Sequence, residues 1–161
     1  MKYTFKDLQK IHRVKEIDGT FVFDDSTKDL EFVDLSGNKE LKVVVFSSPQ
    51  NNLKYLDLSY CSIIKIVFSE NCKNIQTIYL HHNQLRYVEF KGYFPFLELV
   101  DLSFNKKLAK LRISQKLPAL NYLYLHQCNF KDLIPLAEYF IKPGFDFNIG
   151  ENKNLQSPPL E

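Results

Sequence analysis

The chain has 161 residues, a length that suits one domain with its own hydrophobic core. Its formal net charge is +2, from 21 basic and 19 acidic residues, so the sequence provides no overall field for binding phosphate backbones or anionic lipid. Hydrophobic residues make up 45% of the chain, a globular proportion that argues against disorder.

Membrane and secretion signals are missing from the sequence. No stretch approaches the ~18 apolar residues that would span a bilayer, and the start, MKYTFKDLQK, lacks the apolar region of a signal peptide. The three cysteines are too few for the disulfide framework of a small secreted protein. These features predict a cytoplasmic protein with no nucleic-acid partner, no membrane partner and no cofactor.

Residues 1–22 are predicted to form an N-terminal cap or a degenerate first copy of the repeat that follows. Within FKDLQKIHRV, apolar residues recur at helical spacing behind Thr4, a residue suited to cap a helix. The unit ends in TFVF at Phe23, which fits the later copies only partly. The apolar residues at helical spacing are Phe5, Leu8, Ile11 and Val14.

Residues 23–155 contain one pattern in repeated copies, five of them clear and about one degenerate. The clear copies read LEFVDLSGN, LKYLDLSYC, IQTIYLHHN, LELVDLSFN and LNYLYLHQC, and they start 22 or 23 residues apart. Each continues with a second apolar segment of the form L-x-x-I-x-F. A weaker sixth copy is FDFNIGEN, with Phe147, Ile149 and Asn152 in register. The clear copies start at Leu30, Leu53, Ile75, Leu97 and Leu120.

The alternation L-x-L predicts a β-strand with one buried face, and so short a unit must stack on its neighbours to bury that face. The repeat resembles the leucine-rich-repeat family over roughly residues 20–155. The resemblance implies an α/β-type, β-rich fold: a right-handed solenoid with a concave parallel β-sheet and an irregular, short-stranded convex side. A short helical insertion is predicted near residues 133–143, opened by Pro135 and closed by Gly144.

One repeat position carries asparagine or cysteine in every copy. In the family that the repeat resembles, these side chains point inward and bind the backbone of the stacked turns, whose buried amides need partners. The register also places Cys72 in a core position, so we interpret all three thiols as structural rather than reactive. This structural ladder consists of Asn38, Cys61, Asn83, Asn105, Cys128 and Asn152.

Two copies carry histidine where others carry serine, which raises the question of catalysis. His81 is expected on the outward face with Ser59 and Ser103 beside it and aspartates diagonal to it, an arrangement that suggests a hydrolase triad. We interpret the row as a solvated polar surface, because DLS is ordinary in this repeat class and the sequence has no oxyanion-hole or nucleophile-turn pattern. We therefore predict that the chain is not an enzyme.

Zinc binding is the other chemical interpretation of the histidines. In HQC, His126 points outward while Cys128 points inward, so the two cannot share one ion. His81 with Asp57 or Asp101 is a weak metal candidate, and we predict no metal site. Because carboxylates flank His81, we expect partner binding to depend on pH near neutrality.

The outward positions of the predicted sheet carry tyrosines among acidic residues, whereas lysine and arginine concentrate on the other segments of each repeat. A row of aromatic residues bordered by charge is typical of a partner-binding surface. We predict a protein–protein interaction module that binds a segment carrying lysine or arginine and that is a fragment of a larger signalling protein. The predicted partner-binding residues are Tyr55, Asp57, Tyr79, His81, Asp101, Tyr122, Tyr124 and His126.

The end of the chain, NIGENKNLQSPPLE, carries a second resemblance. It is similar to the N-P-L-x-x-P-P-x-E segment that closes repeat domains before the GTPase domain of bacterial Roco proteins, although Lys153 stands where proline is common. The resemblance implies an alternative function, as an intramolecular scaffold or regulatory domain of a Roco-type GTPase. No G-x-x-x-x-G-K-[ST] motif is present, so we expect this chain not to hydrolyse GTP. The matching residues are Asn152, Leu155, Pro158, Pro159 and Glu161, and residues 156–161 are interpreted as an exit segment or the artificial end of a cloned fragment.

Overall fold

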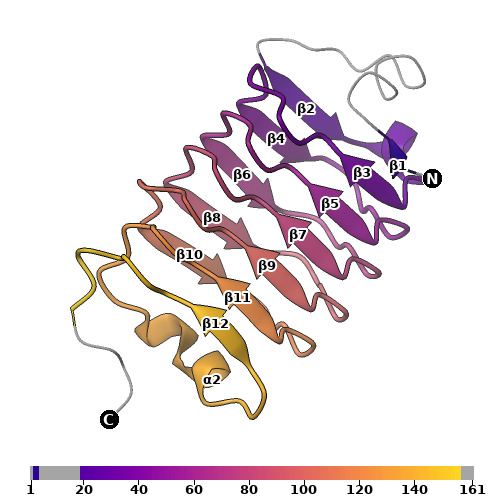
Figure 1. The fold of residues 1–161 in the computed structure, drawn as a ribbon. Helices are drawn as coiled ribbons and strands as arrows, with labels where there is room; N and C mark the ends of the chain where they lie inside the picture. Colours follow the sequence, from indigo (N-terminus) through magenta and orange to yellow (C-terminus); the bar gives the residue numbers. More distant parts are fainter. Residues whose placement is uncertain (1, 4–18, 157–161) are drawn as a thin grey trace.

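Two stacked parallel β-sheets form a β-solenoid in the computed structural model, which describes residues 2–3 and 19–156 (Figure 1). Successive repeats add one strand to each sheet, so segments one repeat apart in sequence lie side by side. The predicted solenoid fold is confirmed. The helix expected between Thr4 and Val14, and the terminal residues Pro158, Pro159 and Glu161, lie outside the described residues.

The seven-stranded sheet is built from the L-x-L segments of the repeats. Its strands pair in parallel with no register shift, as in Phe32 opposite Tyr55 and Tyr55 opposite Thr77. The short strands follow from the pattern, since only the central residue of each segment has to face inward. In order across the sheet, the strands are β1 (Lys2–Tyr3), β3 (Phe32–Asp34), β5 (Tyr55–Asp57), β7 (Thr77–Tyr79), β9 (Leu99–Asp101), β11 (Tyr122–Tyr124) and β12 (Asp146–Asn148).

The second apolar segment of each repeat forms a five-stranded parallel sheet. The sequence predicts an irregular side with short strands here, and the structure is more regular, with four-residue strands in continuous register. The regularity has a local cause, because L-x-x-I-x-F buries alternate residues such as Val44 and Phe46 while Val45 faces out. The strands are β2 (Thr20–Phe23), β4 (Val43–Phe46), β6 (Lys65–Phe68), β8 (Tyr87–Phe90) and β10 (Lys110–Ile113).

The core lies between the two sheets and contains a column of phenylalanine rings, one from each successive strand. Phe23 stacks on Phe46 with ring centroids 4.6 Å apart, and Phe68 stacks on Phe90 at the same distance. All four side chains are buried. Because ring burial removes a large apolar area and adjacent rings add contact energy, this column ties each repeat to the next.

A short helical segment covers the end of the core beside β12 (Figure 1). It consists of a 3-10 helix, η2 (Ile134–Leu136), and α2 (Ala137–Phe140), while Gly144 adopts a φ of 76° after the helix ends. Tyr139 is buried there, and its hydroxyl accepts a hydrogen bond from the Leu117 N–H (3.1 Å). A second 3-10 helix, η1 (Asp25–Thr27), is capped by Asp24. None of the helices in the described part of the chain is long and apolar enough to cross a membrane.

Candidate partner-binding face

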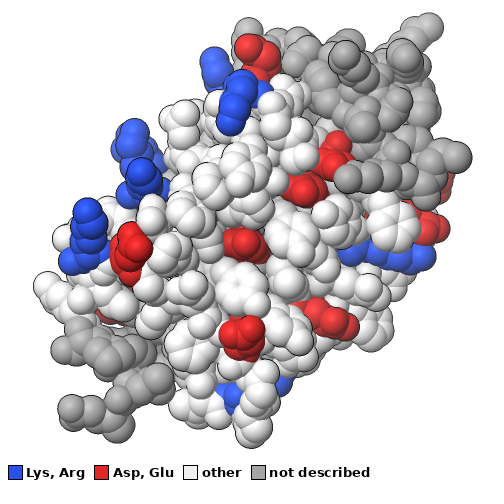
Figure 2. Space-filling model, in the orientation of Figure 1, with Lys and Arg blue, Asp and Glu red and all other residues white. Residues whose placement is uncertain are grey.

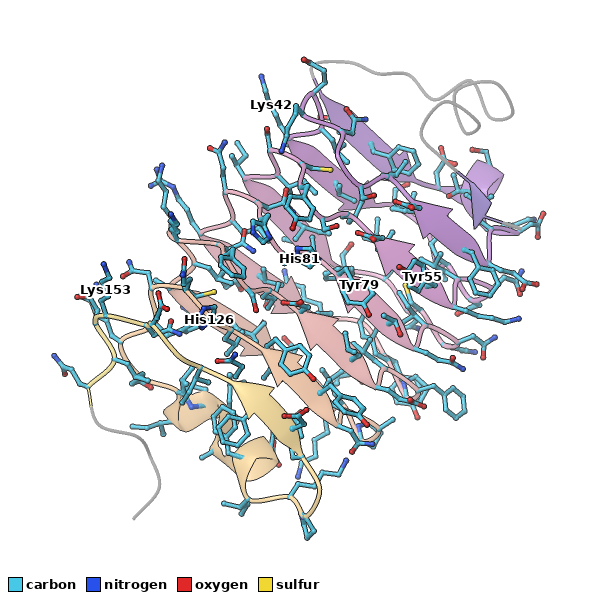
Figure 3. All side chains as sticks on the ribbon, in the orientation of Figure 1. Lys42, Tyr55, Tyr79, His81, His126 and Lys153 are labelled. Carbon is cyan, nitrogen blue, oxygen red and sulfur yellow. The ribbon has the colours of Figure 1, made fainter. Side chains whose placement is uncertain are left out.

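The outward side chains of β3, β5, β7, β9, β11 and β12, together with those two residues after each strand, form a surface that we call the seven-stranded face. Strand pairing aligns these side chains in three rows across the sheet. Figure 3 shows the labelled Tyr55, Tyr79, His81 and His126 on this face. All the predicted partner-binding residues therefore lie on one surface. Tyr55 and Tyr122 belong to the first row, Asp57, Tyr79, Asp101 and Tyr124 to the second, and His81 and His126 to the third.

The charge on the seven-stranded face is entirely negative at the three outward positions of β3 through β12. Asp34, Asp57, Asp101 and Asp146 occupy these positions, and neither lysine nor arginine does. Figure 2 shows the acidic residues scattered over this face, with basic residues toward its margins. The face therefore attracts cations, and its tyrosines supply contact area between the carboxylates.

The aspartates also have a structural role at the strand ends. The Asp57 carboxylate accepts a hydrogen bond from the Ser59 N–H (2.9 Å), and Asp101 accepts the equivalent bond from the Ser103 N–H (2.9 Å). Aspartate commonly binds the amide two residues further on in this way and so fixes a turn. The DLS sequence is thus explained by backbone geometry, and Asp57 and Asp101 remain partly exposed at the surface.

Two tyrosine hydroxyls are bound to carboxylates on the face. Tyr124 donates to Asp146 across adjacent strands (3.0 Å), and Tyr55 donates to Asp57 along its own strand (3.5 Å). Burial, followed by the charge of Asp57, raises the pKa of Tyr55 to about 12, so its hydroxyl remains a donor. Tyr55 also meets Tyr79 edge-on, with ring centroids 5.8 Å apart. These contacts hold the rings in place before any partner arrives.

The geometry does not form a hydrolase triad from these residues. The Ser59 hydroxyl donates to Asp57 (2.6 Å) rather than to a histidine, and Ser59 and Ser103 are both buried. His81 instead has its Nδ1 atom 3.0 Å from Nδ1 of His82. A nucleophilic serine needs a base within hydrogen-bond reach and access to substrate. Among the described residues, no three His, Cys, Asp or Glu side chains are grouped so that they could hold a metal ion.

His126 borders a groove of about 520 Å³ on the seven-stranded face. Its Nε2 atom lies 3.8 Å from a carboxylate oxygen of Glu151, and it shares the groove wall with both acidic and aromatic side chains. The groove lies toward the β12 end of the sheet, and all three rows contribute to its lining. Its other lining residues are His81, His82, Asp101, Ser103, Phe104, Tyr124, Asp146, Phe147 and Asn148.

His82 is a structural feature that the sequence reasoning missed. Its ring lies flat between Tyr60, at 4.3 Å, and Phe104, at 4.2 Å, with interplanar angles of 17° and 16°. The signal was present in the sequence, since all three residues occupy the same position in consecutive repeats. We define Tyr60, His82 and Phe104 as the ring stack.

Protonation of His82 is expected to destabilise the fold. Burial in the stack, followed by the nearby charge of His81, lowers the pKa of His82 from its ordinary value of 6.5, while Asp101 opposes the shift. As pH falls below about 6.5, the unfolded chain takes up a proton that the folded chain still excludes, so stability declines until the pH passes the lower folded-state pKa.

Urea unfolding at several pH values tests this expectation. His82→Phe keeps a ring in the stack and removes the proton, so its free energy of unfolding should fall less between pH 7.5 and 5 than that of the wild type. Asn74→Ala, which removes only an exposed amide and leaves the ring stack and every ionisable group in place, should show the same fall as the wild type. If the free energy of unfolding falls equally between pH 7.5 and 5 in the wild type and in His82→Phe, protonation of His82 does not affect stability.

The structural ladder of asparagine and cysteine residues lies inside the turns. The Asn105 side chain is fully buried, accepts a bond from the Leu85 N–H (3.1 Å) and donates to the carbonyls of Leu80 (2.9 Å) and Leu102 (2.8 Å). Asn83 and Asn152 make the equivalent three bonds in their own repeats. Each of these three asparagines thus joins two consecutive repeats through their backbones.

Cysteine makes a smaller set of bonds at the ladder position. The thiols of Cys61 and Cys128 donate to the carbonyls of Leu35 (3.2 Å) and Leu102 (3.3 Å). For Asn38, in the first complete repeat, the structure shows its Oδ1 accepting from the Glu40 N–H (3.3 Å). All three cysteines are buried and free.

Burial keeps the thiols protonated. It raises the pKa of Cys61 to about 11 and the pKa values of Cys72 and Cys128 to about 12. A thiolate is the reactive form of cysteine, so the three side chains act as small buried groups rather than as nucleophiles.

Comparison with known proteins gives matches in the repeats. The family model for leucine-rich repeats (two copies) matches residues 51–92. A Roc-COR-CHAT protease from an unknown prokaryotic organism is 32% identical over 104 residues, which is 65% of this chain and 10% of that protein. A Roc-COR-CHAT protease from Runella zeae is 39% identical over 56 residues, or 35% of this chain and 6% of that protein.

A receptor also shows similarity to this chain. The leucine-rich repeat-containing G-protein coupled receptor 4 of Xenopus tropicalis is 36% identical over 64 residues, which is 39% of this chain and 7% of the receptor. The chain thus spans a tenth or less of the curated relatives it matches. No solved structure gives a significant match. The repeat register, the buried ladder and these matches lead to one conclusion: the chain contains leucine-rich repeats and resembles Roco-type proteins.

Proposed function

We propose that the chain is a protein-interaction module whose seven-stranded face binds a partner segment carrying lysine or arginine. Leucine-rich repeats generally mediate protein–protein interactions, and solenoids present extended surfaces for that purpose. The observation that supports the choice of face is its second row, where Asp57, Tyr79, Asp101 and Tyr124 alternate across four adjacent strands. Carboxylates there would pair with basic side chains, and the rings would cover their aliphatic stems.

Rigidity of the face favours binding. Tyr55 and Tyr124 are already held by hydrogen bonds to Asp57 and Asp146, and the strands beneath them pack on a continuous core. A partner would therefore lose its own freedom on binding but would not have to order the tyrosines. As part of the same proposal, the module works in the cytoplasm within a larger signalling protein.

Site-specific photocrosslinking tests which surface the partner uses. A photoreactive phenylalanine analogue replaces Tyr122, which is 40% exposed on the seven-stranded face, or Val45, which is 38% exposed on the five-stranded sheet. Irradiation in cells should produce a covalent adduct of defined mass from position 122 and little from position 45. Adducts from position 45 alone would move the binding surface to the five-stranded sheet.

A second candidate function is an intramolecular scaffold or regulatory domain of a Roco-type GTPase. The observation that favours it is the similarity to two Roc-COR-CHAT proteases, together with the chain-end pattern around Asn152 and Leu155. If the coding sequence continues past residue 161 into a phosphate-binding motif, the downstream domain can be produced separately. It should then bind the repeat domain in trans, and Tyr79→Ala should weaken that binding. A continuation without such a motif would exclude this candidate.

A further inference from the structure

The turns after the strands of the seven-stranded sheet share an unusual backbone conformation. One residue in each repeat has a positive φ, between 51° and 76°, and only one of these residues is glycine. The repeated conformation directs their side chains along one edge of the solenoid, which we call the turn edge. The residues of the turn edge are Gly37, Tyr60, His82, Phe104, Gln127 and Glu151.

The ring stack at the turn edge has one open end. His82 is covered on both faces, and Phe104 meets the His126 ring at 5.2 Å. Tyr60 stacks on His82 and also meets the His81 ring edge-on at 5.1 Å, while the next residue along the turn edge is Gly37, which has no side chain. A Cβ atom added to Gly37 would meet nothing within 4 Å, and Tyr60 is 47% exposed. The stack therefore ends in a space suited to one more planar group.

Lysines surround this part of the turn edge. A groove of about 440 Å³ runs along the ring stack, and all of its charged lining residues are lysines: Lys39, Lys106 and Lys107. Lys39 lies closest to the open end, because its ammonium group donates to the Tyr60 carbonyl (2.7 Å). The remaining donors of that ammonium group can bind an anion beside the exposed tyrosine ring.

We propose that the open end of the ring stack binds an aromatic side chain that stands next to a carboxylate in a partner peptide. The aromatic ring stacks on Tyr60 above Gly37, and the carboxylate pairs with Lys39. This site goes beyond the proposed function, because it uses the lysines of the turn edge rather than the aspartates of the seven-stranded face. The partner segment at this site is acidic, whereas the segment proposed for the seven-stranded face is basic.

Other planar groups fit the open end less well. An arginine side chain can stack on a tyrosine ring, but the charge of Lys39 would repel it. Single-stranded nucleic acid needs a series of exposed ring faces for successive bases, whereas stacking within Tyr60, His82 and Phe104 leaves one. An acidic peptide with one aromatic residue matches both the single ring face and the positive charge.

Nuclear magnetic resonance titration of the isotope-labelled 161-residue chain tests the proposal. The probe is acetyl-Glu-Tyr-Glu-amide, and the control peptides are acetyl-Lys-Tyr-Lys-amide and acetyl-Glu-Ala-Glu-amide. The probe should shift the amide signals of Gly37 and Tyr60 and should bind at least about fivefold more tightly than either control, since each control lacks one of the two contacts.

Variants at the site locate the contact. Gly37→Tyr places a ring in the open space and should abolish the response, whereas Gly37→Asn tolerates the same positive φ and should preserve it. Lys39→Gln removes the carboxylate contact and should weaken the probe to about the level of the acetyl-Lys-Tyr-Lys-amide control. Replacing Tyr79 and Tyr124 by alanine should leave probe binding unchanged, which separates this site from the seven-stranded face.

Three results would overturn the proposal. One is the absence of any shift at Gly37 with about 10 mM probe, a concentration that detects even millimolar affinity. Another is equal binding of the three peptides, which would mean that neither the ring nor the charge is recognised. The third is tighter binding of oligothymidylate than of the probe, measured from the amide signals of Gly37 and Tyr60. That result would make the turn edge a nucleic-acid site.

Discussion

Replacing Tyr79 and Tyr124 by alanine is expected to weaken partner binding at least about tenfold, or ~1.4 kcal/mol. The two tyrosines lie in the second row, where each stands beside Asp101. Their loss removes the central aromatic area and the bond that orients Asp146. Titration calorimetry with the purified partner measures the change.

Folding should survive this double replacement. The residues that flank each tyrosine in sequence, Ile78, Leu80, Leu123 and Leu125, carry the buried side of the strands. The matched control is Tyr87→Ala, which removes an outward tyrosine from β8 in the five-stranded sheet and should leave affinity unchanged. Unaltered affinity in the double variant, or a loss only in the Tyr87 variant, would refute the role of the second row.

Replacing Asn105 by alanine is expected to lower the free energy of unfolding by about 3 kcal/mol. The change leaves the Leu85 N–H without its partner and removes a donor from the carbonyls of Leu80 and Leu102, all in buried surroundings. Since these bonds join consecutive repeats, the loss acts on the interface between them. Urea unfolding followed by circular dichroism measures the effect.

Two further variants separate the ladder from a general effect of losing an amide. Asn74→Ala removes an exposed bond to the Asn51 carbonyl (2.7 Å) and should cost about 0.5 kcal/mol or less. Asn105→Cys should cost less than Asn105→Ala, because a thiol at this position can donate to one carbonyl, as Cys61 and Cys128 do. Similar losses for Asn74→Ala and Asn105→Ala would contradict the role of the ladder.

The repeat pattern was sufficient to predict the orientation of side chains along the seven-stranded sheet. Leu80 and Leu125 are fully buried, whereas the histidines that follow them are half-buried on the outer face. This alternation depends only on the two-residue period of a strand and on the stacking of equivalent positions. Because both are local properties of the sequence, the three rows of the candidate site could be predicted from the sequence alone.

Side-chain pairing could not be predicted in the same way. The pattern places Ser59, Asp57 and His81 near one another, but only coordinates show that the serine bonds to the aspartate and the histidine to His82. The direction of a hydroxyl or an imidazole depends on competing partners within a few ångströms, which a repeat alignment does not rank.

The turn edge was missed for a different physical reason. A positive φ is uncommon for residues other than glycine, so Tyr60 and Phe104 did not suggest a left-handed turn. The useful signal was the alignment of these residues with Gly37 in the first complete repeat. The aromatic residues at that position form a stack, because the spacing between strands places successive rings at stacking distance.

Amide hydrogen exchange of the chain with and without its crosslinked partner tests the central claim most directly. We predict that the partner slows exchange in the strands that carry the second row, Tyr55–Asp57, Thr77–Tyr79, Leu99–Asp101 and Tyr122–Tyr124, with no change in the five-stranded sheet. Slower exchange confined to Val43–Phe46 and Lys65–Phe68 would contradict the assignment of the seven-stranded face as the binding surface.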